Sequence, residues 1–133
     1  MFLPVNDMAF IYCNPNPERR LSIDCTVRAI SIALDEDWEE AYMGIALEGL
    51  LLHDMPSSNK VWGSYLIKKG FMQTLVPNVC PDCCTVSQFC IDHPTGTYLV
   101  NTDQHVVAVV GGNYYDTWDS GDEIVNHYWT KEN

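Results

Sequence analysis

The sequence predicts an α+β fold in which N-terminal helices pack on a C-terminal antiparallel sheet. Between residues 25 and 93, apolar side chains recur mostly at helical spacing, whereas short runs of β-branched and aromatic residues follow Pro94. Helices that precede strands, instead of alternating with them, favour α+β over α/β. The chain has 133 residues, of which 47% are hydrophobic, and it contains neither an internal repeat nor a low-complexity linker. We therefore expect a single domain over residues 1–133.

The first half of the chain is predicted to be mainly helical. A short strand over residues 8–12 and a breaker, Asn14-Pro15-Asn16-Pro17, come first. Apolar spacing and capping residues then place helices at residues 25–34, 37–52 and 58–68. Ser22 or Asp24 caps the first of these helices, which puts Cys25 in its first turn.

The second half of the chain is predicted to contain most of the sheet. A strand over residues 71–76 comes first, and a short helix between Thr85 and Pro94 follows it. Four further strands are expected at residues 97–100, 105–110, 113–118 and 123–129. Between the second and third of these strands, Gly111-Gly112 supplies the positive φ angles of a two-residue hairpin turn.

Charge restricts the partners that suit this chain. Seven Lys and Arg residues against 18 Asp and Glu residues give a net charge of −11, which repels nucleic acid and anionic membranes. No stretch is long and apolar enough for a membrane span, and the first residues lack the basic and apolar regions of a signal peptide. We therefore expect a cytoplasmic protein with no nucleic-acid or membrane partner.

Cys25 is the leading candidate for a nucleophile. In a chain with no export signal, the six cysteines are more typical of thiols, a metal site or a nucleophile than of a disulfide framework. Because Cys25 opens a helix, its sulfur faces unpaired backbone N–H groups and the positive end of the helix dipole, and both favour the thiolate. The alternative for this residue is simple burial in the core.

A nucleophilic cysteine needs a base, and His105 has the most suitable context among the four histidines. It opens an apolar strand, so its ring would lie at the mouth of the sheet. If Gly111-Gly112 forms a two-residue turn, Asp116 shares the face of His105 within diagonal reach, where its carboxylate would orient the imidazole. A three-residue turn would instead pair His105 with Asp119.

These residues resemble the papain-like superfamily of cysteine peptidases. The resemblance lies in a cysteine that opens a helix, a histidine that opens a strand and, after a hairpin, the triplet Asp116-Thr-Trp118, since the orienting Asn or Asp of that superfamily is often followed by a small residue and Trp. Longer segments are similar to a group of small uncharacterised bacterial and phage proteins: Asp24-Cys-Thr-Val-Arg-Ala-Ile30, Val61-Trp-Gly-Ser64, His105-Val-Val-Ala-Val-Val-Gly111 and Tyr115-Asp-Thr-Trp-Asp-Ser120.

The resemblance implies a papain-like fold and a thiol-dependent hydrolase, a cysteine peptidase or amidase. Cys25 would be the nucleophile, His105 the base and Asp116 the orienting group. Such an enzyme would act on a peptide or protein substrate by acyl transfer and would need no cofactor.

One position departs from the papain-like pattern. These enzymes commonly have a glutamine six residues before the cysteine as an oxyanion donor, and this chain has Arg19 there. Asn14, Asn16 and the backbone N–H of Cys25 are alternative donors. The departure leaves a second hypothesis open, that the chain is a catalytically inactive binding or regulatory module with the same fold.

A second group of cysteines suggests a zinc site. Cys80 and Cys83 are followed by Cys90 and His93, and four such ligands suit a tetrahedral zinc ion. Cys90 and His93 would share one face of the short helix. The spacing is not that of a common zinc finger, and separate packing roles for the four side chains are the alternative. A structural zinc would fit the inactive module.

Overall fold

Four helices form where capping residues and apolar spacing predict them. The computed structural model describes residues 9–131, and its helices are α1 (Cys25–Leu34), α2 (Trp38–Leu52), α3 (Asn59–Lys68) and α4 (Val86–Asp92). The hydroxyls of Ser58 and Thr85 cap α3 and α4 by accepting hydrogen bonds from backbone N–H groups of the first turn. Asp37 stands at the N-cap of α2 as expected, although its side chain makes no capping hydrogen bond within the described residues.

Six strands form one mixed sheet, so the expectation of a purely antiparallel, C-terminal sheet is wrong in two respects. The strands are β1 (Phe10–Tyr12), β2 (Met72–Leu75), β3 (Thr97–Asn101), β4 (Val106–Val110), β5 (Asn113–Asp116) and β6 (His127–Thr130). Their order is β1-β5-β4-β3-β6-β2, so the two edge strands come from earlier parts of the chain. Moreover, β1 runs parallel to β5. A parallel pair is feasible here because the intervening helices give the chain room to cross over.

The hairpin between β4 and β5 has the predicted two-residue turn. Val110 pairs with Asn113, and the two turn residues, Gly111 and Gly112, have φ angles of 60° and 80°. Positive φ at both central positions is what a type I′ turn requires. The three-residue alternative is therefore wrong, and Asp119 accepts a hydrogen bond from the Tyr114 hydroxyl instead of pairing with His105.

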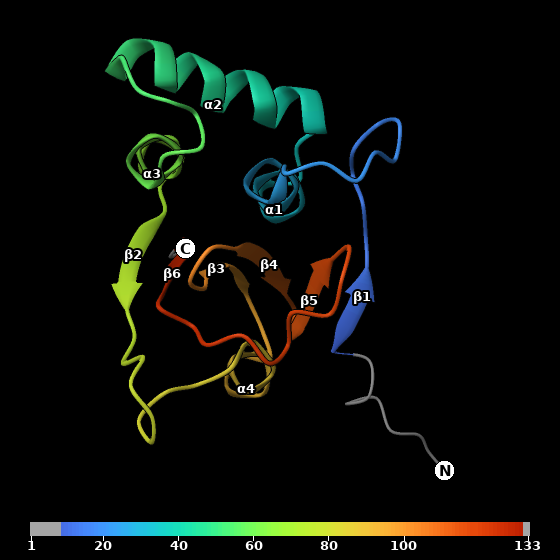
Figure 1. Cartoon of the computed structure of the whole chain (residues 1–133), viewed down its shortest axis with the longest axis vertical. Helices are drawn as coiled ribbons and strands as arrows, with labels where there is room; N and C mark the ends of the chain where they lie inside the picture. The colour runs from blue at the N-terminus through green and yellow to red at the C-terminus, as the bar shows by residue number, and fades with distance from the viewer. Residues whose placement is uncertain (1–8, 132–133) are drawn as a thin grey trace.

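The sheet separates two hydrophobic layers, with α1, α2 and α3 on one face and α4 on the other (Figure 1). Successive residues of β4 alternate between the layers. Val106 and Ala108 belong to the layer under α1, α2 and α3. Val107 and Val109 belong to the layer under α4. Because β4 is buried on both faces, the residue that precedes it, His105, is attached to a rigid part of the fold.

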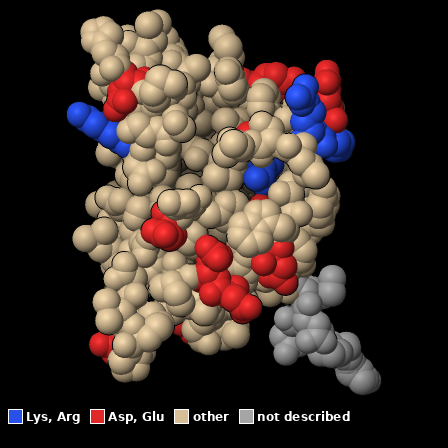
Figure 2. Space-filling view, viewed as in Figure 1, with Lys and Arg blue, Asp and Glu red and all other residues tan. Residues whose placement is uncertain are grey.

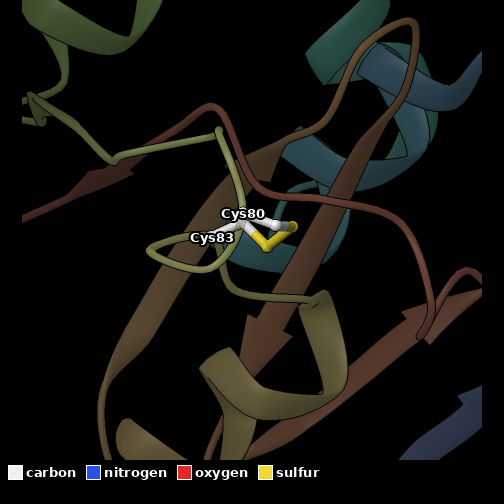
Figure 3. The surroundings of a disulfide bond; sticks show 2 residues. All are labelled: Cys80 and Cys83. Atoms are coloured by element: carbon white, nitrogen blue, oxygen red, sulfur yellow. A yellow bond between two sulfur atoms is a disulfide. The ribbon is translucent and has the colours of Figure 1, made fainter.

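A disulfide bond joins Cys80 and Cys83 in the loop between β2 and α4 (Figure 3). The expectation of thiols or metal ligands is therefore wrong for this pair. The reason is local geometry, because the turn brings the two Cα atoms to 4.5 Å, within bonding range. The remaining cysteines are free: Cys13, Cys25, Cys84 and Cys90.

Acidic side chains appear on several parts of the face shown in Figure 2, and basic ones are few. A net charge of −11 gives the protein a negative field that added salt screens. Within residues 9–131, no helix combines the length and the apolar character needed to cross a membrane.

The two turn glycines should differ in their tolerance of a side chain. A Cβ at Gly111 would meet nothing within 4 Å, so Gly111→Ala should cost about 1–2 kcal/mol of unfolding free energy from the left-handed conformation alone. A Cβ at Gly112 would also lie 3.2 Å from the Pro94 Cα atom, so Gly112→Ala should cost more. Urea denaturation of both variants measures the difference. Equal losses would contradict the described packing of the turn on Pro94.

Candidate active site

Cys25 is the first residue of α1, as the sequence predicts, and its half-buried thiol interacts with His105. Burial alone would raise the pKa of the Cys25 thiol. Hydrogen bonds with the His105 ring and the Val106 backbone N–H outweigh burial, so the thiol pKa lies below its ordinary value. Cys25 therefore ionises more readily than an ordinary cysteine, which is the property that a nucleophilic thiol needs.

His105 lies at the end of the tight turn that precedes β4, between the thiol and a carboxylate. Its Nε2 atom is 2.5 Å from Oδ2 of Asp116, so Nδ1 is the ring nitrogen left for Cys25. Burial lowers the pKa of His105, but the hydrogen bonds with Asp116 and Cys25 more than compensate and raise that pKa to about 9. At neutral pH the ring is therefore a cation.

Asp116 is the last residue of β5, and its carboxylate is buried, with 1% of the side chain exposed. Arg28 Nη1 and the Thr117 backbone N–H donate to Oδ1, each at 2.8 Å. His105 and the Ser120 hydroxyl, at 3.2 Å, contact Oδ2. Burial alone would raise the pKa of Asp116, but the hydrogen bonds from His105 and Arg28 lower it. The carboxylate therefore stays ionised and fixed in orientation.

Arg28 is the site residue that sequence reasoning missed. It lies in α1, buried, and joins two carboxylates, because Nη1 contacts Asp116 and Nε lies 2.8 Å from Oδ1 of Asp24. One signal in the sequence could have indicated that Arg28 is buried. Arg28 stands between Val27 and the apolar pair Ala29-Ile30 on a helix that packs against the sheet. These residues form one connected set, here called the buried polar network: Asp24, Arg28, Asp116 and His105.

The donors considered for an oxyanion are engaged within their own loop or at the start of α1. Arg19 Nη1 donates to the Asn16 carbonyl at 3.0 Å, and Asn14 Nδ2 donates to a carbonyl of the same loop at 3.1 Å. The Asn16 amide is directed to Asp24, with Nδ2 3.5 Å from Oδ2. Because Asp24 makes no capping hydrogen bond within the described residues, the first backbone N–H groups of α1 are left as donors for an oxyanion.

A pocket of about 250 Å³ opens beside Cys25 and His105, and we call it the thiol pocket. Most of its lining residues have polar side chains, among them Ser57, Asn101 and Gln104. Outside the pocket lining, the Trp118 ring lies against His105 with ring centroids 4.8 Å apart. The thiol and the imidazole thus border a space that a substrate can enter.

The zinc candidates are not brought together. Cys80 and Cys83 are joined to each other, and Cys90 is buried in the layer under α4, where burial raises its pKa to about 11. His93 Nδ1 lies 2.9 Å from the Phe89 carbonyl, and the two rings stack. Across residues 9–131, no group of three or more His, Cys, Asp and Glu side chains is placed to bind a metal ion. The four side chains therefore do not form one site.

Comparisons with family models, with curated proteins and with solved structures found no match. Residues 9–131 form a mixed α+β arrangement of four helices and one six-stranded sheet. Membership of the papain-like superfamily remains a proposal that rests on the candidate site itself.

Replacement of the buried Asp116 carboxylate should return the pKa of His105 toward the value of an ordinary histidine. Asp116→Asn should lower the pKa of His105 from about 9 toward 6.5, as followed by NMR titration of the imidazole protons. Because the folded pKa lies above the unfolded value, the pair stabilises the protein fully below about pH 6.5, and this contribution is lost as pH rises through about 9. The variant should thus lose most stability between about pH 4 and pH 6.5, where the Asp116 carboxylate is ionised and His105 is a cation, and least in alkali. Asp119→Asn is the matched control, and an unchanged titration in Asp116→Asn would refute the contact.

Removal of Arg28 should leave two buried carboxylates without their shared cation. Arg28→Met should therefore lower the free energy of unfolding by about 3–5 kcal/mol. Arg28→Lys should lose less, since it retains the charge but cannot contact both carboxylates with one planar group. Urea denaturation measures both, with the exposed Arg20→Met as control. A loss in Arg28→Met no greater than in the control would show that the network contributes nothing to stability.

Proposed function

We propose that the protein is a papain-like thiol hydrolase, a cysteine peptidase or amidase that cleaves an amide bond of a peptide or protein. The observation that supports this most is the arrangement of His105, which contacts Asp116 through Nε2 at 2.5 Å and interacts with the Cys25 thiol. Acyl transfer by a thiol requires a nucleophile that contacts a base, and a carboxylate that contacts and orients the base.

The charge state of the pair supports the proposal. The contacts of His105 lower the pKa of the Cys25 thiol and raise the pKa of the imidazole, so both shifts favour the thiolate–imidazolium form of the pair. A larger fraction of the nucleophile is then ionised before a substrate arrives than in an ordinary cysteine. The Arg28 contact keeps Asp116 ionised, so the imidazolium retains its counter-charge.

The reaction would proceed in two stages. The Cys25 thiolate attacks the carbonyl carbon, forming a C–S bond and an oxyanion that faces the backbone N–H groups at the start of α1. His105 gives its proton to the leaving amine as the C–N bond breaks, which leaves an acyl-thioester on Cys25. His105 then takes a proton from water, the hydroxide displaces the thiolate, and the acid product departs.

The reactivity of Cys25 tests the first requirement of this proposal. At about pH 6, the Cys25 thiol should react with iodoacetamide at least about tenfold faster than a cysteine peptide, as followed by mass spectrometry. Cys13 and Cys84 are internal controls, because burial raises the pKa of each of these free thiols. His105→Ala should remove the advantage. If Cys25 reacts no faster than the two controls, the thiolate assignment is wrong.

Hydrolysis of a library of peptide amides tests the activity itself. Turnover that the wild type shows and Cys25→Ala loses would support the hydrolase. A reactive Cys25 without any turnover would favour the inactive binding module. That alternative is motivated by Arg19, Asn14 and Asn16, whose side chains bond to their own loop or to Asp24.

A further inference from the structure

Strand β2 is an edge of the sheet and lies at the left margin of the molecule in Figure 1. All four of its residues are exposed. Just beyond the strand, the Val76 backbone N–H donates to the Asn126 carbonyl, and in an antiparallel pair such bonds recur at every second residue. Gln73 and Leu75 are therefore the β2 residues whose backbone N–H and C=O groups face away from β6. These groups are available to a further strand.

A groove of about 460 Å³ lies between α3 and the β2 edge, and we call it the edge groove. Its lining includes the apolar residues Leu52, Gly63 and Ile67, and Gln73 on the β2 side. Trp129 of β6 also lines the edge groove, and only 5% of this residue is exposed. Its Nε1 is buried and has no hydrogen-bond partner within the described part of the chain. Because a buried donor without an acceptor is costly, a ligand that brings an acceptor to this indole would be favoured.

The segment that forms α3 and β2 is basic, in contrast to the chain as a whole. Residues 55–81 contain none of the 18 Asp and Glu residues but three of the seven Lys and Arg residues. Lys68 and Lys69 form ion pairs with glutamates, whereas Lys60, which lines the edge groove, has no ion pair within the described residues. Because the Debye length is about 8 Å at physiological salt, this lysine outweighs distant carboxylates for a ligand in the groove. The edge groove therefore suits a ligand with a carboxylate.

We propose that the β2 edge and the edge groove bind an extended acidic segment of a partner protein, which adds a strand to the sheet. This inference does not depend on the proposed hydrolase. The backbone of the segment exchanges hydrogen bonds with Gln73 and Leu75. Because side chains alternate along a strand, every second side chain of the segment enters the groove. There, apolar groups contact Leu52 and Ile67, and a carboxylate contacts Lys60.

Three capped heptapeptides test the proposal on the intact wild-type protein. The peptide acetyl-Thr-Ile-Thr-Glu-Thr-Ile-Thr-amide has its Glu and both Ile side chains on one face of a strand. Two matched probes carry Gln or Lys in place of Glu. In NMR titrations we expect the Glu peptide to bind at least about tenfold more tightly than the Lys peptide, with the Gln peptide between them. Added salt should reduce this difference.

Two sets of NMR signals locate the bound peptide. The Gln73 and Leu75 amides should exchange rapidly with solvent in the free protein and become protected in the complex, because the added strand accepts their hydrogen bonds. The indole signal of Trp129, identified by its loss in Trp129→Phe, should shift as the groove fills. These signals report on the edge itself, so they distinguish strand addition from binding elsewhere.

Four results would overturn the proposal. The Glu and Lys peptides could bind equally tightly, or none of the three peptides could bind at millimolar concentration. Shifts confined to the His105 signals would place the peptide in the thiol pocket instead. Finally, the Gln73 and Leu75 amides could be protected in the protein alone, to an extent that grows with its concentration. That result would assign the β2 edge to a second copy of this chain.

A matched pair of charge reversals tests the role of Lys60. Lys60→Glu should weaken binding of the Glu peptide at least about tenfold and favour the Lys peptide. The variant should fold, because this position is in the first turn of α3, where the helix dipole favours an acidic side chain. Arg20→Glu changes the net charge equally at an exposed position outside the edge groove, and it should leave both affinities near their wild-type values. Equal weakening in the two variants would show that only overall charge matters, and the proposal would be wrong.

Discussion

The rest of the site depends on the burial of Arg28 together with Asp116. Removal of two charges from water costs several kcal/mol for each ion, and only full hydrogen bonding compensates for this cost. Here Arg28 contacts two carboxylates, and Asp116 is contacted by four donors from α1, from the residue before β4 and from the segment that follows β5. A shift of any of these elements would remove hydrogen bonds from a buried charge. The network thereby favours one arrangement of the helix, the sheet and the imidazole.

Local signals in the sequence were sufficient to predict where helices and strands lie, but not which strands pair across the fold. Helix α1 has the predicted bounds, and the two turn glycines established the register of β4 and β5, because capping and turn conformations depend on neighbouring residues. Strand β1 was expected, yet nothing within residues 8–12 indicates that it runs parallel to β5. Such pairing depends on how the intervening helices direct the chain, and a local pattern does not encode that path.

The candidate site shows the same division. Alternation along the strands predicted the contact of His105 with Asp116. Strict alternation also puts the Asp116 side chain on the face of Tyr114, under α4, which is the face opposite α1. Its contact with Arg28 of α1 is feasible because Asp116 ends β5, where the sheet no longer separates the two layers. Arg28 escaped notice because an isolated cation on a helix is usually exposed. The disulfide between Cys80 and Cys83 was not predicted, because the absence of an export signal argued against disulfides in general and does not take account of two cysteines that a tight turn brings together.

The separation of 88 residues between Arg28 and Asp116 has a consequence for biosynthesis. A chain made from its N-terminus exposes α1, with Cys25 and Arg28, long before β5 leaves the ribosome. Until then Cys25 lacks His105 and behaves as an ordinary thiol, and β1 has no partner strand. The thiol therefore acquires its lowered pKa only when the last third of the chain has folded against the first.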